Sequence, residues 1–234
     1  MTAHHRPWRT VALAALALAA CGGPVEATPR AAATPLCATV ASAPGAGSAQ
    51  ILAGDRAQAR AAFESALAQD PDRLSALNDL AVSYYLDGRF EAARQLLDEV
   101  VARGTSREQQ AALVNLGELY ALDGYVSAAR AHLESARGID PGRPEPLYAL
   151  GLLADARGDS AAALALAREA LRLDESGAAR QGLTFVYPEE RTHLEALLAE
   201  ALGDRDLALS RWRDLKAGRF PALATAAQRH LEEP

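Results

Sequence analysis

A glycine that recurs about every 34 residues constrains the fold of this chain more than any other feature. These glycines are spaced by 34, 36, 34 and 45 residues and stand at Gly54, Gly88, Gly124, Gly158 and Gly203. An alanine follows each of them five residues later, at Ala59, Ala93, Ala129, Ala163 and Ala208. Because two markers keep one register over most of the chain, the sequence predicts a supersecondary unit that is repeated and stacked.

Each unit is expected to be a pair of helices joined by a tight turn at the glycine. Between residues 110 and 141, Leu113, Leu116 and Tyr120 follow helical spacing before Gly124, which can adopt the positive φ of a helix end. The second helix should end at Pro141, since proline cannot continue the helical hydrogen-bond ladder.

The composition agrees with a helical core and argues against one class of ligand. Apolar residues make up 50% of the chain but aromatic residues only 5%, so the core must consist mainly of alanine and leucine. That favours closely packed helices over sheets. The formal charge of -6 argues against a nucleic-acid partner, because phosphate binding needs a basic surface.

The unit between residues 110 and 141 resembles the tetratricopeptide repeat. It has the leucine, small, aromatic and proline residues of that family's signature, at Leu116, Gly117, Tyr120, Ala129, Ala136 and Pro141. The resemblance implies an all-α fold, a TPR-type right-handed α-solenoid of helix hairpins. We expect a degenerate first repeat at 49–73, three repeats over 74–175, an insertion at 176–188, and a last repeat-like pair with a capping helix at 189–234.

The insertion carries Phe185, Val186 and Tyr187 and allows two interpretations. It either protrudes as a contact element, because loops in repeat proteins often lie on a binding face, or its apolar side chains fold back on the neighbouring helices. We favour the second interpretation.

The first twenty residues have the pattern of a secretory signal peptide. Arg6 and Arg9 precede an apolar run over 11–20, which at about 1.5 Å per residue is too short to span a bilayer. Leu18-Ala19-Ala20-Cys21 resembles a bacterial lipobox. That resemblance implies a diacylglyceryl thioether and an N-acyl group, such as palmitate, on Cys21. The alternative is an ordinary cleaved signal.

The resemblance also suggests where the protein resides. Gly22 occupies the position where retention in the inner membrane typically requires aspartate. We therefore expect an outer-membrane lipoprotein facing the periplasm, with the periplasmic face of the inner membrane or secretion as alternatives. Residues 21–48, rich in Ala, Pro and Gly, should form a flexible tether, in which Cys37 is an incidental thiol or forms an intermolecular disulfide.

The concave face of such a solenoid is lined by the first helix of each pair and is the expected binding groove. The positions opposite the packing residues mix aromatic, amide and apolar side chains and are Asn78, Val82, Tyr85, Val114, Asn115, Glu118, Tyr148, Leu152 and Asp155. Asn78 and Asn115 could bond the backbone of an extended or helical segment.

Catalysis is not expected. His132, His193 and His230 are not at metal-ligand spacing, and neither a phosphate loop nor a Gly-x-Ser-x-Gly elbow is present. Trp212 should be buried, so it offers no platform for a glycan. No cofactor, metal or small-molecule substrate is predicted.

The sequence therefore favours a non-catalytic, lipid-anchored periplasmic adaptor that binds a protein during envelope or secretion-system assembly. A pilotin-like factor for a type IV pilus secretin is one alternative. An adaptor for peptidoglycan or its hydrolases is another, and self-association is a third.

Overall fold

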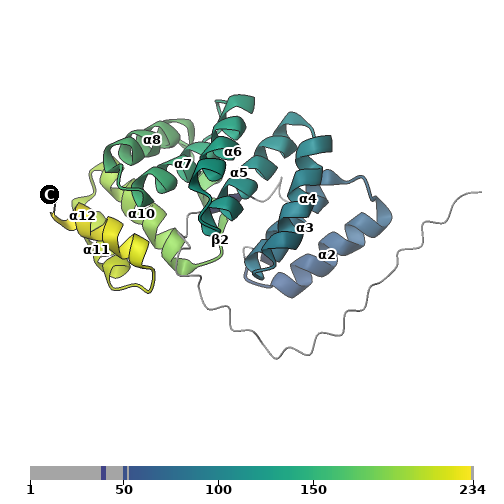
Figure 1. Ribbon diagram of the computed structural model, residues 1–234, viewed down its shortest axis with the longest axis horizontal. Helices are drawn as coiled ribbons and strands as arrows, with labels where there is room; N and C mark the ends of the chain where they lie inside the picture. Colours follow the sequence, from purple (N-terminus) through teal and green to yellow (C-terminus); the bar gives the residue numbers. More distant parts are fainter. Residues whose placement is uncertain (1–37, 41–49, 52, 233–234) are drawn as a thin grey trace, which may run out of the picture.

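The computed structural model describes residues 38–40, 50–51 and 53–232, and eleven helices run through these residues. Most of them form consecutive antiparallel pairs (Figure 1). The pairs are α3 (Leu74–Leu86) with α4 (Phe90–Arg103), α5 (Ser106–Leu122) with α6 (Val126–Ile139), α7 (Glu145–Ala156) with α8 (Ser160–Leu173), and α10 (Pro188–Leu202) with α11 (Arg205–Lys216). The expected all-α solenoid of helix hairpins is confirmed.

The two ends of the solenoid depart from this pairing. At the start, α2 (Arg56–Gln69) packs on α3 as a second helix, which fits the degenerate first repeat. At the other end, α12 (Pro221–Glu232) packs on α11 and also reaches back to α7. No helix of the described segments is both long enough and apolar enough to cross a membrane.

The insertion between α8 and α10 contains the short helix α9 (Ala178–Gln181) and the strand β2 (Leu183–Phe185). Its partner strand, β1 (Ala38–Val40), comes from far upstream and runs antiparallel to β2, with Ala38 opposite Phe185 and Val40 opposite Leu183. Residues 38–40 belong to the expected tether, so that prediction is wrong for these three residues. The rest of the tether, Cys37, the signal peptide and Cys21 lie outside the described residues.

Small side chains hold the paired helices together, as the repeat register predicts. Five of the buried alanines follow the turn glycines and are at most 4% exposed: Ala59, Ala93, Ala129, Ala163 and Ala208. Four positions further on, the larger residues of the register are also buried, among them Phe63, Leu97, Leu133 and Trp212. Because alanine lets two helix backbones approach closely, one residue type repeated at one register position builds a continuous core.

The turns within the pairs also match the prediction. Gly124 takes φ 84°, a left-handed conformation that other residues adopt only with strain. The helix after each turn begins with aspartate at three sites, Asp55, Asp159 and Asp204, and each carboxylate accepts a hydrogen bond from the backbone amide three residues on. These caps satisfy amide groups that the helix leaves without a partner.

Candidate functional site

The predicted groove residues lie on one face of α3, α5 and α7, which we call the first-helix face. All nine are buried, with at most 2% of each residue exposed: Asn78, Val82, Tyr85, Val114, Asn115, Glu118, Tyr148, Leu152 and Asp155. The expectation that these side chains line an open groove is therefore wrong. Whether they bind a partner stays a prediction.

Two features explain why the first-helix face is covered. The strand β1 lies against α5 and α7, the first helices of two consecutive pairs. The insertion folds back on the helices, as we favoured, because Leu183 is 1% exposed and Val186 and Tyr187 pack against the core of the first repeats. Tyr187 also packs against the core of the later repeats, so the insertion bridges the two hydrophobic clusters.

The part of the first-helix face on α3 and α5 mixes apolar residues with buried amide and acidic side chains. The amide nitrogen Nδ2 of Asn115 donates to Oδ1 of Asn78 at 3.1 Å, so the two asparagines link the two helices. Asp79 and Glu118 are buried beside them. No arginine or lysine is buried anywhere among the described residues. An acidic residue in a segment that lies on this face would therefore find no buried positive charge to pair with.

On α7, Tyr148 fastens the base of the insertion. Its hydroxyl donates to a carboxylate oxygen of Asp174 at 2.9 Å, and Asp174 also accepts the backbone amides of Ala179 and Arg180 at 3.0 Å. Burial, and then the bond to Asp174, raise the pKa of Tyr148. The tyrosine that we predicted to face a partner instead holds the chain that leads into β2.

Asp155, at the end of α7, is the centre of a buried charge cluster that the sequence did not predict. Its carboxylate oxygens lie 2.7 Å from Nε2 of His193 and 2.8 Å from Nε2 of His230. The other ring nitrogen of His230 lies 2.8 Å from Glu200, which also accepts from the indole N–H of Trp212 at 2.8 Å. His193 and His230, which are not at metal-ligand spacing in the sequence, thus meet on one carboxylate.

The geometry of this cluster explains its pKa shifts. Although burial alone would lower it, the pKa of His230 is raised to about 9, because both ring nitrogens face carboxylates. The pKa of Asp155 is lowered: burial opposes the charged form, but the hydrogen bonds to His193 and His230 outweigh it. The ring of His230 also stacks on Trp212, with centroids 4.1 Å apart. The cluster holds α7, α10 and α12 together by charge and packing.

The same cluster lacks the arrangement of a nucleophile with its base. The hydroxyl of Ser160 donates to Asp155 at 3.0 Å rather than to a histidine. Within the described part of the chain, no three histidine, cysteine or acidic side chains are placed to hold a metal ion.

A small cavity of about 140 Å³ lies beside the Asp155 cluster. It is lined by Glu200, Gly203, Arg205, Ala208, Leu209, Trp212 and His230.

One residue that follows the insertion carries a buried carboxyl group. Glu190 is 1% exposed, and one of its carboxylate oxygens accepts the backbone amide of Tyr187 at 3.0 Å. Burial raises the pKa of Glu190 to about 8, although hydrogen bonds from the Tyr187 and Val186 backbone act in the opposite direction. With the tilted contact between the Tyr187 and Phe220 rings, 5.0 Å apart, this interaction anchors the chain that leaves β2.

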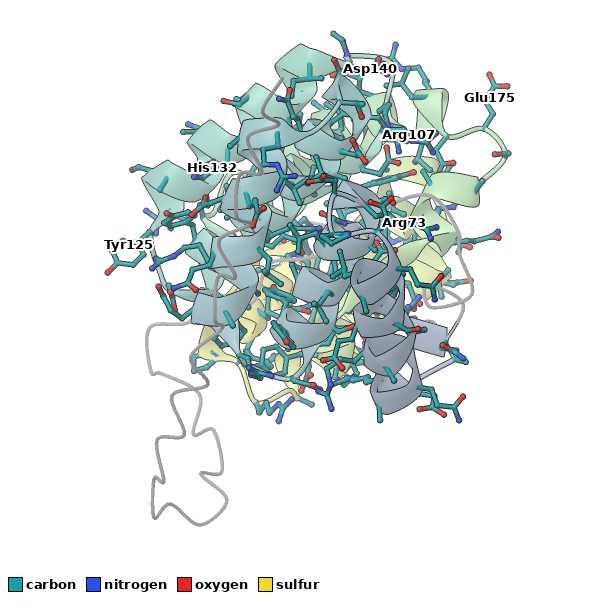
Figure 2. All side chains as sticks on the ribbon, turned by 90° about the vertical axis from the view of Figure 1, so that its right-hand side faces the viewer. Arg73, Arg107, Tyr125, His132, Asp140 and Glu175 are labelled. Atoms are coloured by element: carbon teal, nitrogen blue, oxygen red, sulfur yellow. The ribbon has the colours of Figure 1, made fainter. Side chains whose placement is uncertain are left out.

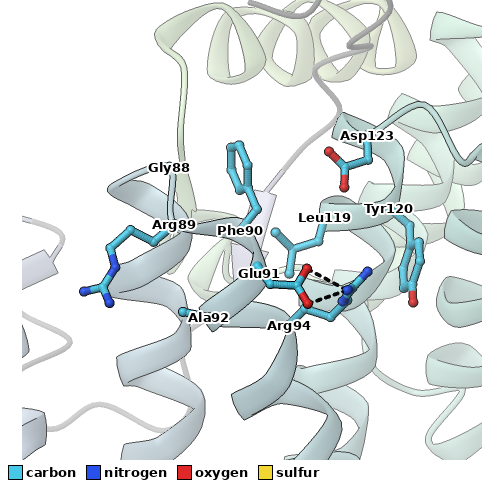
Figure 3. A pocket seen from close by; sticks show the side chains of 9 residues that line it. All are labelled: Gly88, Arg89, Phe90, Glu91, Ala92, Arg94, Leu119, Tyr120 and Asp123. Carbon is cyan, nitrogen blue, oxygen red and sulfur yellow. Dashed lines mark hydrogen bonds and ion pairs between the residues drawn. The ribbon is translucent and has the colours of Figure 1, made fainter. Parts of the chain in front are cut away.

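A second candidate surface is an open cleft of about 480 Å³ beside the N-terminus of α4 and the C-terminal part of α5 (Figure 3). Arg94 lies within it but is paired with Glu91, and both carboxylate oxygens lie 2.6 Å from the guanidinium. The other lining residues are Gly88, Arg89, Phe90, Ala92, Leu119, Tyr120 and Asp123. Because the cleft is lined by both basic and acidic side chains, its charge favours neither anionic nor cationic ligands. The first-helix face is therefore the stronger candidate for a binding site.

His132 belongs to the outer surface of α6, the second helix of its pair (Figure 2). Its ring stacks on Tyr120 with centroids 4.9 Å apart, and burial lowers its pKa. Nearby, Tyr125 is 62% exposed and projects away from the body of the protein.

Comparisons with known proteins support the repeat assignment. A family model described as tetratricopeptide repeat matches residues 50–117. A thermophilic TPR protein of Thermus thermophilus superposes with a TM-score of 0.56 at 24% identity, over 79% of this chain and 95% of that one. A chain of the APC/C hetero-tetramer Cut9-Hcn1 superposes with a TM-score of 0.54 at 20% identity.

These similarities concern the fold. The match to the Cut9-Hcn1 structure covers 71% of this chain but only 31% of the other, so this protein spans about a third of that chain's length. No curated protein matches the sequence. Residues 50–117 thus carry a tetratricopeptide repeat, and the whole described body is a TPR-type solenoid, an architecture that serves as a protein–protein interaction scaffold.

Proposed function

We propose that this protein is a non-catalytic adaptor that binds an extended segment of a partner protein along its first-helix face. The observation that carries this proposal is the position of β1: a stretch of extended backbone already lies against α5 and α7 and pairs with β2. This face already accommodates an extended segment of the same chain. It therefore has the shape, and β2 has the hydrogen-bonding edge, that an extended segment of a partner protein would require.

The polar character of the face supports a peptide rather than a small apolar ligand. Asn78, Asn115 and Glu118 make this face polar, whereas small-molecule sites are mostly apolar with few polar groups. The buried Asp155 cluster, by contrast, joins α7, α10 and α12 and leaves its groups paired within the protein. We therefore assign Asp155 and its partners to stability, and the other residues of the first-helix face to binding.

We further propose that the adaptor is attached by lipid on Cys21 to the outer membrane, faces the periplasm, and acts in envelope or secretion-system assembly. This part rests on the sequence of residues 1–21, which has the order of a lipoprotein signal: basic residues, an apolar run, small residues and cysteine. Several acyl chains together anchor a protein far more firmly than one chain does.

The binding proposal can be tested by photo-crosslinking in cells, followed by mass spectrometry. One probe replaces the half-buried Val186, beside β2, and a control probe replaces the exposed Ala165, on α8. We expect a protein that is captured at position 186 but not at 165, and that binds the purified adaptor directly. Equal capture at both positions, or none at 186, would contradict the proposal.

A further inference from the structure

The insertion presents β2 as a strand held firmly at both ends. Before it, Tyr148 and the backbone amides of residues 179 and 180 bind Asp174. After it, Glu190 bonds the Tyr187 backbone and Tyr187 packs on Phe220. Within β2 itself, Leu183 and Thr184 are at most 5% exposed. A strand fixed in this way is a preformed template for pairing with another extended segment.

The segment that pairs with β2 in the structure is held by much less. β1 has three residues, and its register with β2 involves only those three. Two-stranded pairs of this length are unstable by themselves in water. Nine residues, 41–49, separate β1 from Gln50. Because β1 belongs to the same chain as β2, its pairing with β2 is an intramolecular event that an added segment must compete with.

We infer that β1 is an intramolecular occupant of a strand-addition site, and that an extended partner segment binds by replacing β1 on β2. This inference rests on the proposed function and specifies the partner's chemistry. The replacing segment must run antiparallel to β2 and lie against α5 and α7, as β1 does. It should also be uncharged or basic, because Glu118 is buried on α5, against which β1 lies, and no arginine or lysine of the described residues is buried to neutralise an acidic segment.

The sequence of β1 indicates which side chains suit the site. Ala38-Thr39-Val40 combines a small residue with two β-branched residues and no charge. Such residues favour extended backbone and cross-strand packing. The partner segment is therefore a short, β-branched stretch without acidic residues in a chain able to extend, such as a terminus or an interdomain linker. Backbone hydrogen bonds supply affinity, and neighbouring side chains supply selectivity.

The test uses the purified full-length chain and a fluorescent peptide carrying residues 35–43, with Ser in place of Cys37. In the variant Thr39→Pro/Val40→Pro, two consecutive N–H groups are missing. Since successive N–H groups of a strand point to opposite sides, one of the two must be directed toward β2. The matched control, Thr39→Val/Val40→Thr, keeps both N–H groups and the composition of the strand.

We expect the peptide to bind the double-proline chain at least about tenfold more tightly than the wild-type or control chain, because the tethered competitor is gone. A peptide with the same two prolines should not bind. Amide exchange at Leu183–Phe185 should be at least about tenfold faster in the double-proline chain without peptide, and slow again with it. Circular dichroism should show that all three chains keep the same helicity.

Equal peptide affinity in the three chains, or unchanged amide exchange at β2, would overturn the inference. A concentration-dependent dimer of the wild type that the double-proline change abolishes would also overturn it, by identifying β1 of a second copy as the occupant. Other results distinguish a failure of this inference from a failure of the proposed adaptor function. If a partner captured at position 186 binds peptide-saturated protein undiminished, only the inference is wrong. If the peptide results hold but no partner exists, only the adaptor function is wrong.

Discussion

At the scale of single residues, the repeat works by keeping certain positions small. Gly117 on α5 lies directly against Leu133 on α6, and a Cβ atom added there would come within 2.6 Å of two Leu133 side-chain carbons. Gly151 holds the equivalent position one repeat later, where the nearest atom would be at 3.4 Å. Two glycines at one register position are thus under different steric constraint, which no sequence comparison of the two repeats would show.

Gly117→Ala should therefore destabilise the protein, by about 1–3 kcal/mol, because Leu133 and α6 must move to admit the methyl group. Gly151→Ala is the matched control. It should be neutral or stabilising, by up to about 1 kcal/mol, since alanine favours helix more than glycine does. Denaturant unfolding of the two variants measures the difference. Equal destabilisation by both would show that close packing of α5 on α6 is not the cause.

A second residue-scale prediction concerns His230. Its folded-state pKa of about 9 lies above the ordinary value of 6.5, so its contribution to stability is complete below pH 6.5 and is lost as pH rises through 9. Between pH 7 and 10, wild type should lose on the order of 3 kcal/mol more of its unfolding free energy than His230→Gln does.

Denaturant midpoints at the two pH values, in wild type and variant, give this difference directly. The buried Glu190 also titrates in this range. Because it does so in both wild type and variant, its contribution cancels in the difference between their unfolding free energies. His132→Gln is the control, because burial lowers the pKa of His132, away from the pH range in which His230 titrates. Parallel pH profiles for wild type and His230→Gln would refute the role of the Asp155 cluster.

At the scale of elements, the helices that follow the turns begin in two ways. Asp55, Asp159 and Asp204 cap α2, α8 and α11 with their side chains, whereas Arg89 and Tyr125 precede α4 and α6 with no side-chain cap. The backbone is nearly the same at capped and uncapped sites, with φ -98° and ψ 69° at Asp159 and φ -83° and ψ 64° at Tyr125. Aspartate would thus fit at Tyr125 without rearrangement.

Tyr125→Asp should stabilise the protein by roughly 0.5–1 kcal/mol, because the new carboxylate would accept from an amide at the start of α6 that lacks a side-chain partner. Asp159→Ala should destabilise it by about the same amount, through loss of the existing cap. Thermal unfolding monitored by circular dichroism reports both changes. A lower melting temperature for Tyr125→Asp would mean that the edge contact with Tyr120 contributes more than the cap.

At the scale of the whole molecule, the solenoid is closed on one side by its own extended segments. β1 and the insertion cover the first-helix face, and α12 reaches back to α7 through His230 and Arg229, whose guanidinium donates to the Asp155 carbonyl at 2.5 Å. If the first-helix face is the binding face, as we propose, the protein is a scaffold whose binding face is preformed but occupied. A partner segment that replaces β1 need not reorganise the helices.

The proposed membrane attachment also belongs to this scale. Cys21→Ala should abolish fatty-acid labelling of the protein and release it from the membrane fraction, because the remaining chain would have no acyl anchor. Cys37→Ala is the matched control and should leave both labelling and fractionation unchanged. Metabolic labelling with an alkyne fatty acid, followed by cell fractionation, measures this. Membrane association that survives in Cys21→Ala would contradict the anchor.

The sequence by itself determined the helix pairs, their turns and the alanine-built core. Each depends on short-range spacing: positions three and four apart share a helix face, and Gly124 or Pro141 ends a helix locally. For the same reason, helical spacing alone identified the residues of the first-helix face, from Asn78 to Asp155.

Only the tertiary structure decided what covers that face. Val40 pairs with Leu183 through backbone groups, which every residue except proline carries, so no side-chain pattern marks the pairing. His193 and His230 reach Asp155 because α10 and α12 return to the end of α7, and a path through space leaves no periodic signal in sequence. Local rules built the repeats, and long-range contacts decided which surfaces remain accessible.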